Sequence, residues 1–99
     1  MIFYSFCPLQ APAERRLAVA EFLTRANYGL IIGNFELDFG DGEIRYKTSL
    51  DVDTDRLTPA LMKQLVYANV LTLDQYLPGI LAVIEGSSLP EEAIAGVET

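Results

Sequence analysis

The feature that most constrains the fold is a stretch of alternating apolar and polar residues on both sides of Asp41-Gly42. This dipeptide favours a two-residue type I′ hairpin turn, whose two central residues both need positive φ. With the turn placed there, one face becomes apolar and the other carries opposite charges. The apolar pairs are Phe39–Ile44, Leu37–Tyr46, Phe35–Thr48, Gly33–Leu50 and Ile31–Val52; the polar pairs are Asp38–Arg45, Glu36–Lys47 and Asn34–Ser49. The pattern predicts an antiparallel hairpin with strands at about 30–39 and 43–52.

Helical periodicity precedes the hairpin. Apolar residues at i, i+3, i+4 and i+7 predict a helix over about 13–27, with Pro12 in its first turn and a left-handed cap at Gly29. They are Val19, Phe22, Leu23 and Ala26. The segment Ile2–Phe6 is rich in β-forming residues and is predicted to be a strand.

A second helical pattern begins at Pro59, with Thr58 as N-cap, and continues to Gly86. Pro78 lies inside it and removes one backbone hydrogen bond, so we expect a break or kink nearby, with Asp74 capping a new helix. The capping-box spacing of Ser88-Leu89-Pro90-Glu91 predicts a last helix from about Pro90 to Val97. The fold class is therefore α+β: a small antiparallel sheet packed against helices, in a single domain over 1–99.

Two short motifs are reminiscent of chemical sites. Asp38-Phe39-Gly40 matches the metal-binding motif of kinases, but 99 residues leave no room for the other kinase motifs. The aspartates at 51, 53 and 55 resemble the start of a calcium loop. A calcium loop of the EF-hand type needs Gly at its sixth position and Glu at its twelfth, where this chain has Arg56 and Met62. We interpret the first motif as a strand end and the second as a solvated connection.

The residue inventory argues against catalysis. The chain has no histidine and one cysteine, Cys7, which excludes a Cys-His nucleophilic pair and a Cys-based zinc site. Cys7 is expected to be a buried or half-buried small hydrophobe. We therefore expect no enzyme activity, no catalytic residues, no cofactor and no metal.

Charge and composition limit the partners. The net charge is −7 and the few basic residues are scattered, so neither nucleic acid nor an anionic membrane is an expected partner. A single cysteine fits a reducing cytoplasm. Hydrophobic residues make up 51% of a chain that buries only about 60–70% of its unfolded surface. Some apolar surface is thus available for a partner.

The sequence also resembles a known family. The segments ERRLAVAEFLTRANYGLIIGNFELDFGDGEIRYKTSLDV, LDQYLPGILAVIEG and SLPEEAI resemble the bacterial YbjN-like family over roughly Glu14 to Ile94. The resemblance implies a fold like that of type III secretion chaperones, a sensory-transduction or chaperone-like role, and frequent dimers. It supplies no catalytic or ligand residues. The family pattern begins earlier, with a helix and strands, so the chain is expected to be the C-terminal part of such a domain, either a fragment or a short member that completes its sheet through a partner.

These observations predict a non-enzymatic protein-binding module, chaperone-like or regulatory, that acts as a homodimer and has a possible protein client. The alternative is a small-molecule-sensing regulatory domain. Ile2–Phe6 is apolar on both alternating faces, as in a strand that is paired at its edge. The expected partner interface comprises Ile2, Phe3, Tyr4 and Phe6.

Overall fold

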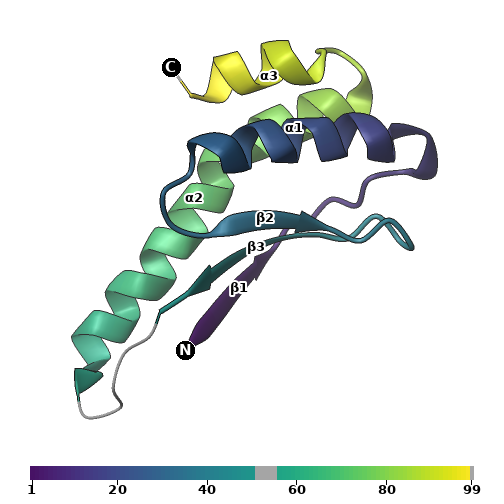
Figure 1. Ribbon diagram of the computed structural model, residues 1–99. Coiled ribbons are helices and arrows are strands. Elements are labelled where there is room, and N and C mark those ends of the chain that lie inside the picture. The colour runs from purple at the N-terminus through teal and green to yellow at the C-terminus, as the bar shows by residue number, and fades with distance from the viewer. Residues whose placement is uncertain (51–55, 99) are drawn as a thin grey trace.

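The computed structural model describes residues 1–50 and 56–98, which form an α+β fold (Figure 1). One strand and one helix are followed by a pair of strands and then a pair of helices. They are β1 (Ile2–Phe6), the 3-10 turn η1 (Ala13–Arg15), α1 (Arg16–Gly29), β2 (Asn34–Leu37), β3 (Ile44–Ser49), α2 (Pro59–Glu85) and α3 (Pro90–Val97). The predicted fold class, with a hairpin in a small antiparallel sheet packed against helices, is confirmed.

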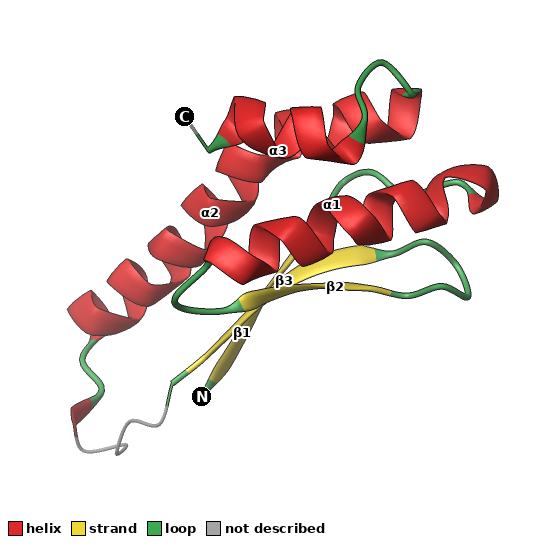
Figure 2. Ribbon diagram, turned by 45° about the horizontal axis from the view of Figure 1, so that its top comes forward, coloured by secondary structure: helices red, strands yellow, loops and turns green. Residues whose placement is uncertain are grey.

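The three strands form one antiparallel sheet in the order β1-β3-β2, so β3 is central. The helices gather on one side of this sheet (Figure 2). Helix α1 packs on β2, α2 packs on β1 and β3, and α3 contacts both α1 and α2. The other face of the sheet carries no helix within the described residues, and the first turns of α2 extend past the sheet (Figure 1).

The core lies between the inner face of the sheet and the helices. The predicted stripe of α1 supplies four of its members, all buried. The buried apolar residues are Ala11, Val19, Phe22, Leu23, Ala26, Phe35, Ile44, Tyr46, Leu73, Tyr76, Ile80, Val83, Ala93 and Ile94. Aromatic rings join the layers, since Phe35 contacts both Tyr46 and Tyr76, with ring centroids 4.9 and 5.4 Å apart.

The predicted hairpin register is wrong by two residues. Phe35 lies opposite Tyr46 and Leu37 opposite Ile44, rather than opposite Thr48 and Tyr46. A shift of two preserves the side-chain period of a strand, so the same residues still face the core. On the other face, Glu36 is therefore opposite Arg45 and makes the ion pair, at 2.7 Å, in place of the predicted Asp38–Arg45 and Glu36–Lys47 pairs.

The longer connection between β2 and β3 explains this shift. The Asp38 amide donates to the Glu43 carbonyl at 2.9 Å, so Asp41-Gly42 lies within a wider loop instead of forming a two-residue turn. The Gly42 carbonyl accepts from the Ala11 amide at 2.9 Å, which fixes this loop against the segment after β1. Gly42 has φ +82°, and a Cβ there would lie 2.1 Å from the Ala11 carbonyl oxygen, so glycine is required.

The predicted strand was also too long. Phe39, expected on the covered face, lies in this loop and is 55% exposed, while Leu37 is half-buried. Ile31, expected in the strand, precedes β2 and is exposed. The predicted partner of Ile31, Val52, lies outside the described residues.

The observed helix ends match the predicted ones at some positions and differ from them at others. Thr58 caps α2, its hydroxyl accepting from the Leu61 amide at 3.1 Å, and Gly86 ends it with φ +76°. The left-handed cap predicted at Gly29 is wrong: α1 includes Gly29 and ends at an extended Leu30. Helix α3 has the predicted bounds, but its N-cap is Leu89, so the predicted capping box at Ser88 does not form.

The break predicted at Pro78 is also wrong, because α2 is one continuous helix, and Asp74 lies inside it and caps no new helix; a kink at Pro78 stays a prediction. Pro78 is exposed, so the Asp74 carbonyl that loses its helical partner faces the solvent side. The next residue, Gly79, lies so close to the Phe22 ring that a Cβ would be 2.6 Å from it. Packing of α2 on α1 on both sides of the proline therefore keeps the helix continuous.

The fully buried Ile44 should contribute more to the stability of the fold than the exposed Phe39. We expect Ile44→Ala to lower the free energy of unfolding by about 2–5 kcal/mol, because Ile44 is fully buried on the central strand. The exposed Phe39→Ala is the matched control and should change it by less than about 0.5 kcal/mol. Urea denaturation measures both; equal effects would contradict the observed register.

The hydrogen bond between Tyr76 on α2 and Glu98 at the end of α3 predicts that the stability of the fold depends on pH. Burial, followed by the hydrogen bond to Glu98, raises the pKa of Tyr76 to about 12, and its hydroxyl donates to Glu98 Oε2 at 2.9 Å. The unfolded value is about 10. The stabilisation of the folded state by the protonated Tyr76 is thus fully present below pH ~10 and is lost as the pH rises from ~10 to ~12. Urea unfolding should show a smaller loss over this range in Tyr76→Phe than in the exposed control Tyr67→Phe. Equal losses would contradict the assignment.

Candidate functional site

The outer edge of β1 is free among the described residues. Met1 exchanges hydrogen bonds with Leu50, and the Cys7 amide donates to the Ile44 carbonyl at 2.8 Å. Antiparallel pairing alternates, so the odd-numbered residues of β1 bond to β3 and the even-numbered ones point their N–H and C=O groups away. The main chain of Ile2, Tyr4 and Phe6 is therefore available to a further strand.

The side chains of the same three residues lie on the open face of the sheet and form what we call the β1 row: Ile2, Tyr4 and Phe6. Phe6 is 56% exposed, and the other two are also exposed. The Tyr4 and Phe6 rings have centroids 6.2 Å apart. The structure thus brings together three of the four predicted interface residues. Phe3 is the exception, because it is half-buried on the inner face.

On the open face, which carries no helix among the described residues, the character of the side chains changes from strand to strand. Next to the β1 row, β3 presents Arg45 and Lys47, and beyond them β2 presents Glu36. The Arg45 guanidinium carbon lies 4.5 Å from the centroid of the Tyr4 ring, a cation–π contact. Its hydrogen bond to Glu36 raises the pKa of Arg45, so this cation stays charged. Moving from β1 to β2, the face changes from apolar to basic to acidic.

The opposite edge of the sheet is closed by a side chain. Asn27, near the end of α1, accepts from the Phe35 amide at 2.6 Å through Oδ1 and donates to the Phe35 carbonyl at 3.0 Å through Nδ2. These two bonds replace those that a neighbouring strand would make to Phe35. Within the described residues, the outward main-chain groups of β1 have no comparable side-chain partner.

A buried amide holds α2 on the sheet. Asn69 is 2% exposed and donates through Nδ2 to the Thr48 hydroxyl on β3 at 2.9 Å and to the Phe3 carbonyl on β1 at 3.4 Å. Its Oδ1 accepts from the Ser5 hydroxyl. The sequence alone makes no prediction for Asn69. A lone asparagine among apolar helix positions is the signal that could have indicated such a bond.

A groove of about 270 Å³ lies between α2, β3 and the segment after α1. Most of its lining is apolar. The lining residues are Leu30, Ile32, Tyr46, Thr48, Leu50, Leu65, Ala68, Asn69 and Thr72. The Tyr46 hydroxyl donates to the Ile32 carbonyl at 2.5 Å, and burial raises its pKa.

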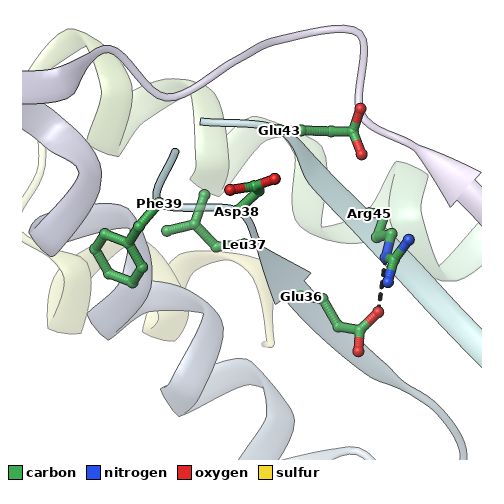
Figure 3. Close-up of a pocket in the computed structure, with 6 residues that line it drawn as sticks. All are labelled: Glu36, Leu37, Asp38, Phe39, Glu43 and Arg45. Carbon is green, nitrogen blue, oxygen red and sulfur yellow. Dashed lines mark hydrogen bonds and ion pairs between the residues drawn. The ribbon is translucent and has the colours of Figure 1, made fainter. Parts of the chain in front are cut away.

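A second hollow, of about 400 Å³, lies at the hairpin end of the open face (Figure 3). Its lining residues are Glu36, Leu37, Asp38, Phe39, Glu43 and Arg45. Two of these carboxylates are already engaged: Glu36 binds Arg45, and Asp38 Oδ1 accepts from the Gly40 amide at 2.7 Å. Asp38-Phe39-Gly40 is thus a turn at a strand end, as predicted.

Metal-binding and nucleophilic groups are not assembled in the described part of the chain. Over residues 1–50 and 56–98, no cluster of histidine, cysteine or carboxylate side chains is arranged to hold a metal ion. The aspartates at 51, 53 and 55 lie outside that part. Cys7 is half-buried, as predicted, and burial raises its thiol pKa, which keeps it protonated at neutral pH.

The family of the chain follows from its sequence. The model of the YbjN family, described as "Putative bacterial sensory transduction regulator", matches residues 5–82, from β1 to near the end of α2. The chain belongs to the YbjN family. The predicted resemblance is therefore confirmed. No curated protein and no solved structure matches this YbjN chain, so the likeness to type III secretion chaperones stays a prediction. Of the helices described, none has the length and apolar character to cross a membrane.

Proposed function

We propose that this YbjN chain is a non-enzymatic regulatory module of the cytoplasm that works by binding protein and acts as a homodimer. The observation that carries the proposal is the free edge of β1, whose exposed β1 row adds apolar side chains to unpaired main-chain groups. The description of the family as a regulator supports the regulatory role.

A free apolar edge calls for a partner strand. Unpaired N–H and C=O groups beside exposed apolar side chains form a template for another chain, and soluble proteins normally cover such an edge. The edge of β2 is covered by Asn27, but β1 has no equivalent among the described residues. A second copy is the commonest way to close such a surface, because two-fold dimers predominate among soluble oligomers. An extended client segment would use the same groups by strand addition and would compete with the second copy.

The chemistry of the chain supports binding over catalysis. A general base is most often histidine, which the sequence lacks, and the one thiol is held protonated by burial. Two carboxylates at the hairpin hollow are already engaged, Glu36 by Arg45 and Asp38 by the Gly40 amide.

Light scattering tests this proposal. The unmodified chain should show twice the monomer mass at micromolar concentration, and Phe6→Asp should shift it to monomer, because a carboxylate would be placed in the apolar β1 row. Tyr28→Asp is the matched control: Tyr28 is 96% exposed, on α1, and its substitution should leave the dimer intact.

Two results would contradict the proposal. One is a monomer at all concentrations with a well-folded circular dichroism spectrum. The other is a dimer that survives Phe6→Asp and dissociates with Tyr28→Asp, which would place the interface on α1.

The groove beside α2 favours a second candidate, a small-molecule-sensing regulatory domain. Its volume of about 270 Å³ and its apolar walls with a few hydroxyl and amide groups suit a small, mostly apolar ligand. In a thermal-shift panel of such compounds, a hit should raise the unfolding midpoint, and Ala68→Phe should abolish the shift by filling the groove. The outward-facing Gln64→Phe is the control, and a shift that persists in Ala68→Phe would contradict binding in the groove.

A further inference from the structure

We infer that a second copy of the chain pairs antiparallel with β1 about a two-fold axis at Tyr4, and that an outer stripe of α2 forms a second layer of the same interface. The stripe consists of Met62, Val66, Val70 and Leu77, and we call it the α2 stripe. This inference rests on the proposed homodimer and specifies its register, its layers and its axis.

The register follows from which main-chain groups are free. Ile2, Tyr4 and Phe6 point theirs outward, so an antiparallel copy must place these residues opposite one another. Pairing about Tyr4 sets Tyr4 opposite Tyr4 of the second copy and Ile2 opposite Phe6 of the second copy. This arrangement uses all three residues on both chains. A two-fold axis between Ile2 and Tyr4, or between Tyr4 and Phe6, would use only two.

The side chains agree with that arrangement. The two β1 rows would become one apolar strip along the open face, with aromatic and aliphatic residues opposed across the axis. Arg45 and Lys47 would border the strip on each side, and Glu36 lies one strand further out. For a chain of charge −7, this strip is a surface where a second copy can approach without opposing carboxylates.

The second layer follows from how Asn69 orients α2. Asn69 faces the sheet, and Leu65 and Thr72 line the groove on the side of β3 and the segment after α1. At 100° per residue, Val66 and Val70 lie beyond Asn69 on the other side of the helix, away from α1. Both are exposed, and α2 packs on the edge strand β1. The α2 stripe therefore borders the free edge.

The spacing along α2 suits a helical partner. The stripe residues Met62, Val66, Val70 and Leu77 are separated by four, four and seven residues, which places them on one face of the helix. Leu73 is buried in the chain's own core, whereas Val66 and Val70 are exposed and Leu77 is half-buried. A two-fold axis at Tyr4 brings the two α2 helices together antiparallel on the inner side of the joined sheet.

A second copy fits these features better than another partner. An isologous interface needs a patch that is complementary to itself, and both layers meet this condition. The free edge pairs with an identical edge, and the apolar stripe packs on an identical stripe. Because the two surfaces adjoin, one axis closes both.

Cysteine cross-linking tests the register in the Cys7→Ser background. Tyr4→Cys should give a disulfide-linked dimer with a mild oxidant, since opposed Cα atoms in such a pair lie about 5.5 Å apart. Ile2→Cys alone and Phe6→Cys alone should stay unlinked, while the double variant Ile2→Cys/Phe6→Cys should link. Linking of Ile2→Cys alone as readily as Tyr4→Cys would overturn the register.

Adjacent α2 residues test the second layer. Val70→Asp should raise the dimer dissociation constant at least about tenfold, whereas Leu71→Asp, exposed on the other side of α2, should leave it unchanged. Equal effects would overturn the second layer.

The outcomes separate the two proposals. A dimer by light scattering that fails to link through Tyr4→Cys would overturn the inferred axis and leave the proposed homodimer standing. A monomer at all concentrations would overturn both.

Discussion

The hydrogen bonds of the buried Asn69 amide are the interaction on which the arrangement of α2 depends. They join one helix to β1 and β3 at once, and leaving the amide unpaired would cost about 1–3 kcal/mol. They also fix the rotation of a 27-residue helix about its axis. With Asn69 toward the sheet, Tyr76 and Ile80 enter the core, Leu65 lines the groove, and Val66 and Val70 remain outside. The apolar surface left over by the fold is thus a consequence of one polar contact.

The two edge strands of the sheet differ in how their outward main-chain groups are paired, so a further strand can add more readily at one edge than at the other. Asn27 satisfies both main-chain groups of Phe35, so β2 ends the sheet. In the described part of the chain, the outward main-chain groups of β1 at Ile2, Tyr4 and Phe6 are unpaired, and their side chains are exposed. An acidic chain of this kind gains solubility from its charge, and in the proposed account the uncharged strip along β1 is where a second copy associates. In the proposed account, regulation operates through competition for this edge.

Much of the fold could be predicted from periodicity. The strand at Ile2–Phe6, the stripe of α1 and the faces of the hairpin all follow from apolar spacing. The register could not be read from the pattern, because a slip of two residues keeps every side chain on its face. What sets it is the contact of Gly42 with Ala11, which are distant in sequence. The break expected at Pro78 does not occur for a related reason: the packing of Gly79 against Phe22 overrides the tendency of proline to interrupt a helix. Of the predicted interface, Ile2, Tyr4 and Phe6 share the open face, and Phe3 does not because strand residues alternate.

Amide hydrogen exchange of β1 as a function of protein concentration tests the central claim most directly. In a dimer closed along this edge, the Tyr4 and Phe6 amides become hydrogen-bonded, so their exchange should slow as the concentration rises through the dissociation constant. The Ser5 and Cys7 amides, which pair with β3 in each copy, should be protected at all concentrations. Fast exchange of Tyr4 and Phe6 at every concentration, with Ser5 and Cys7 protected, would contradict the account.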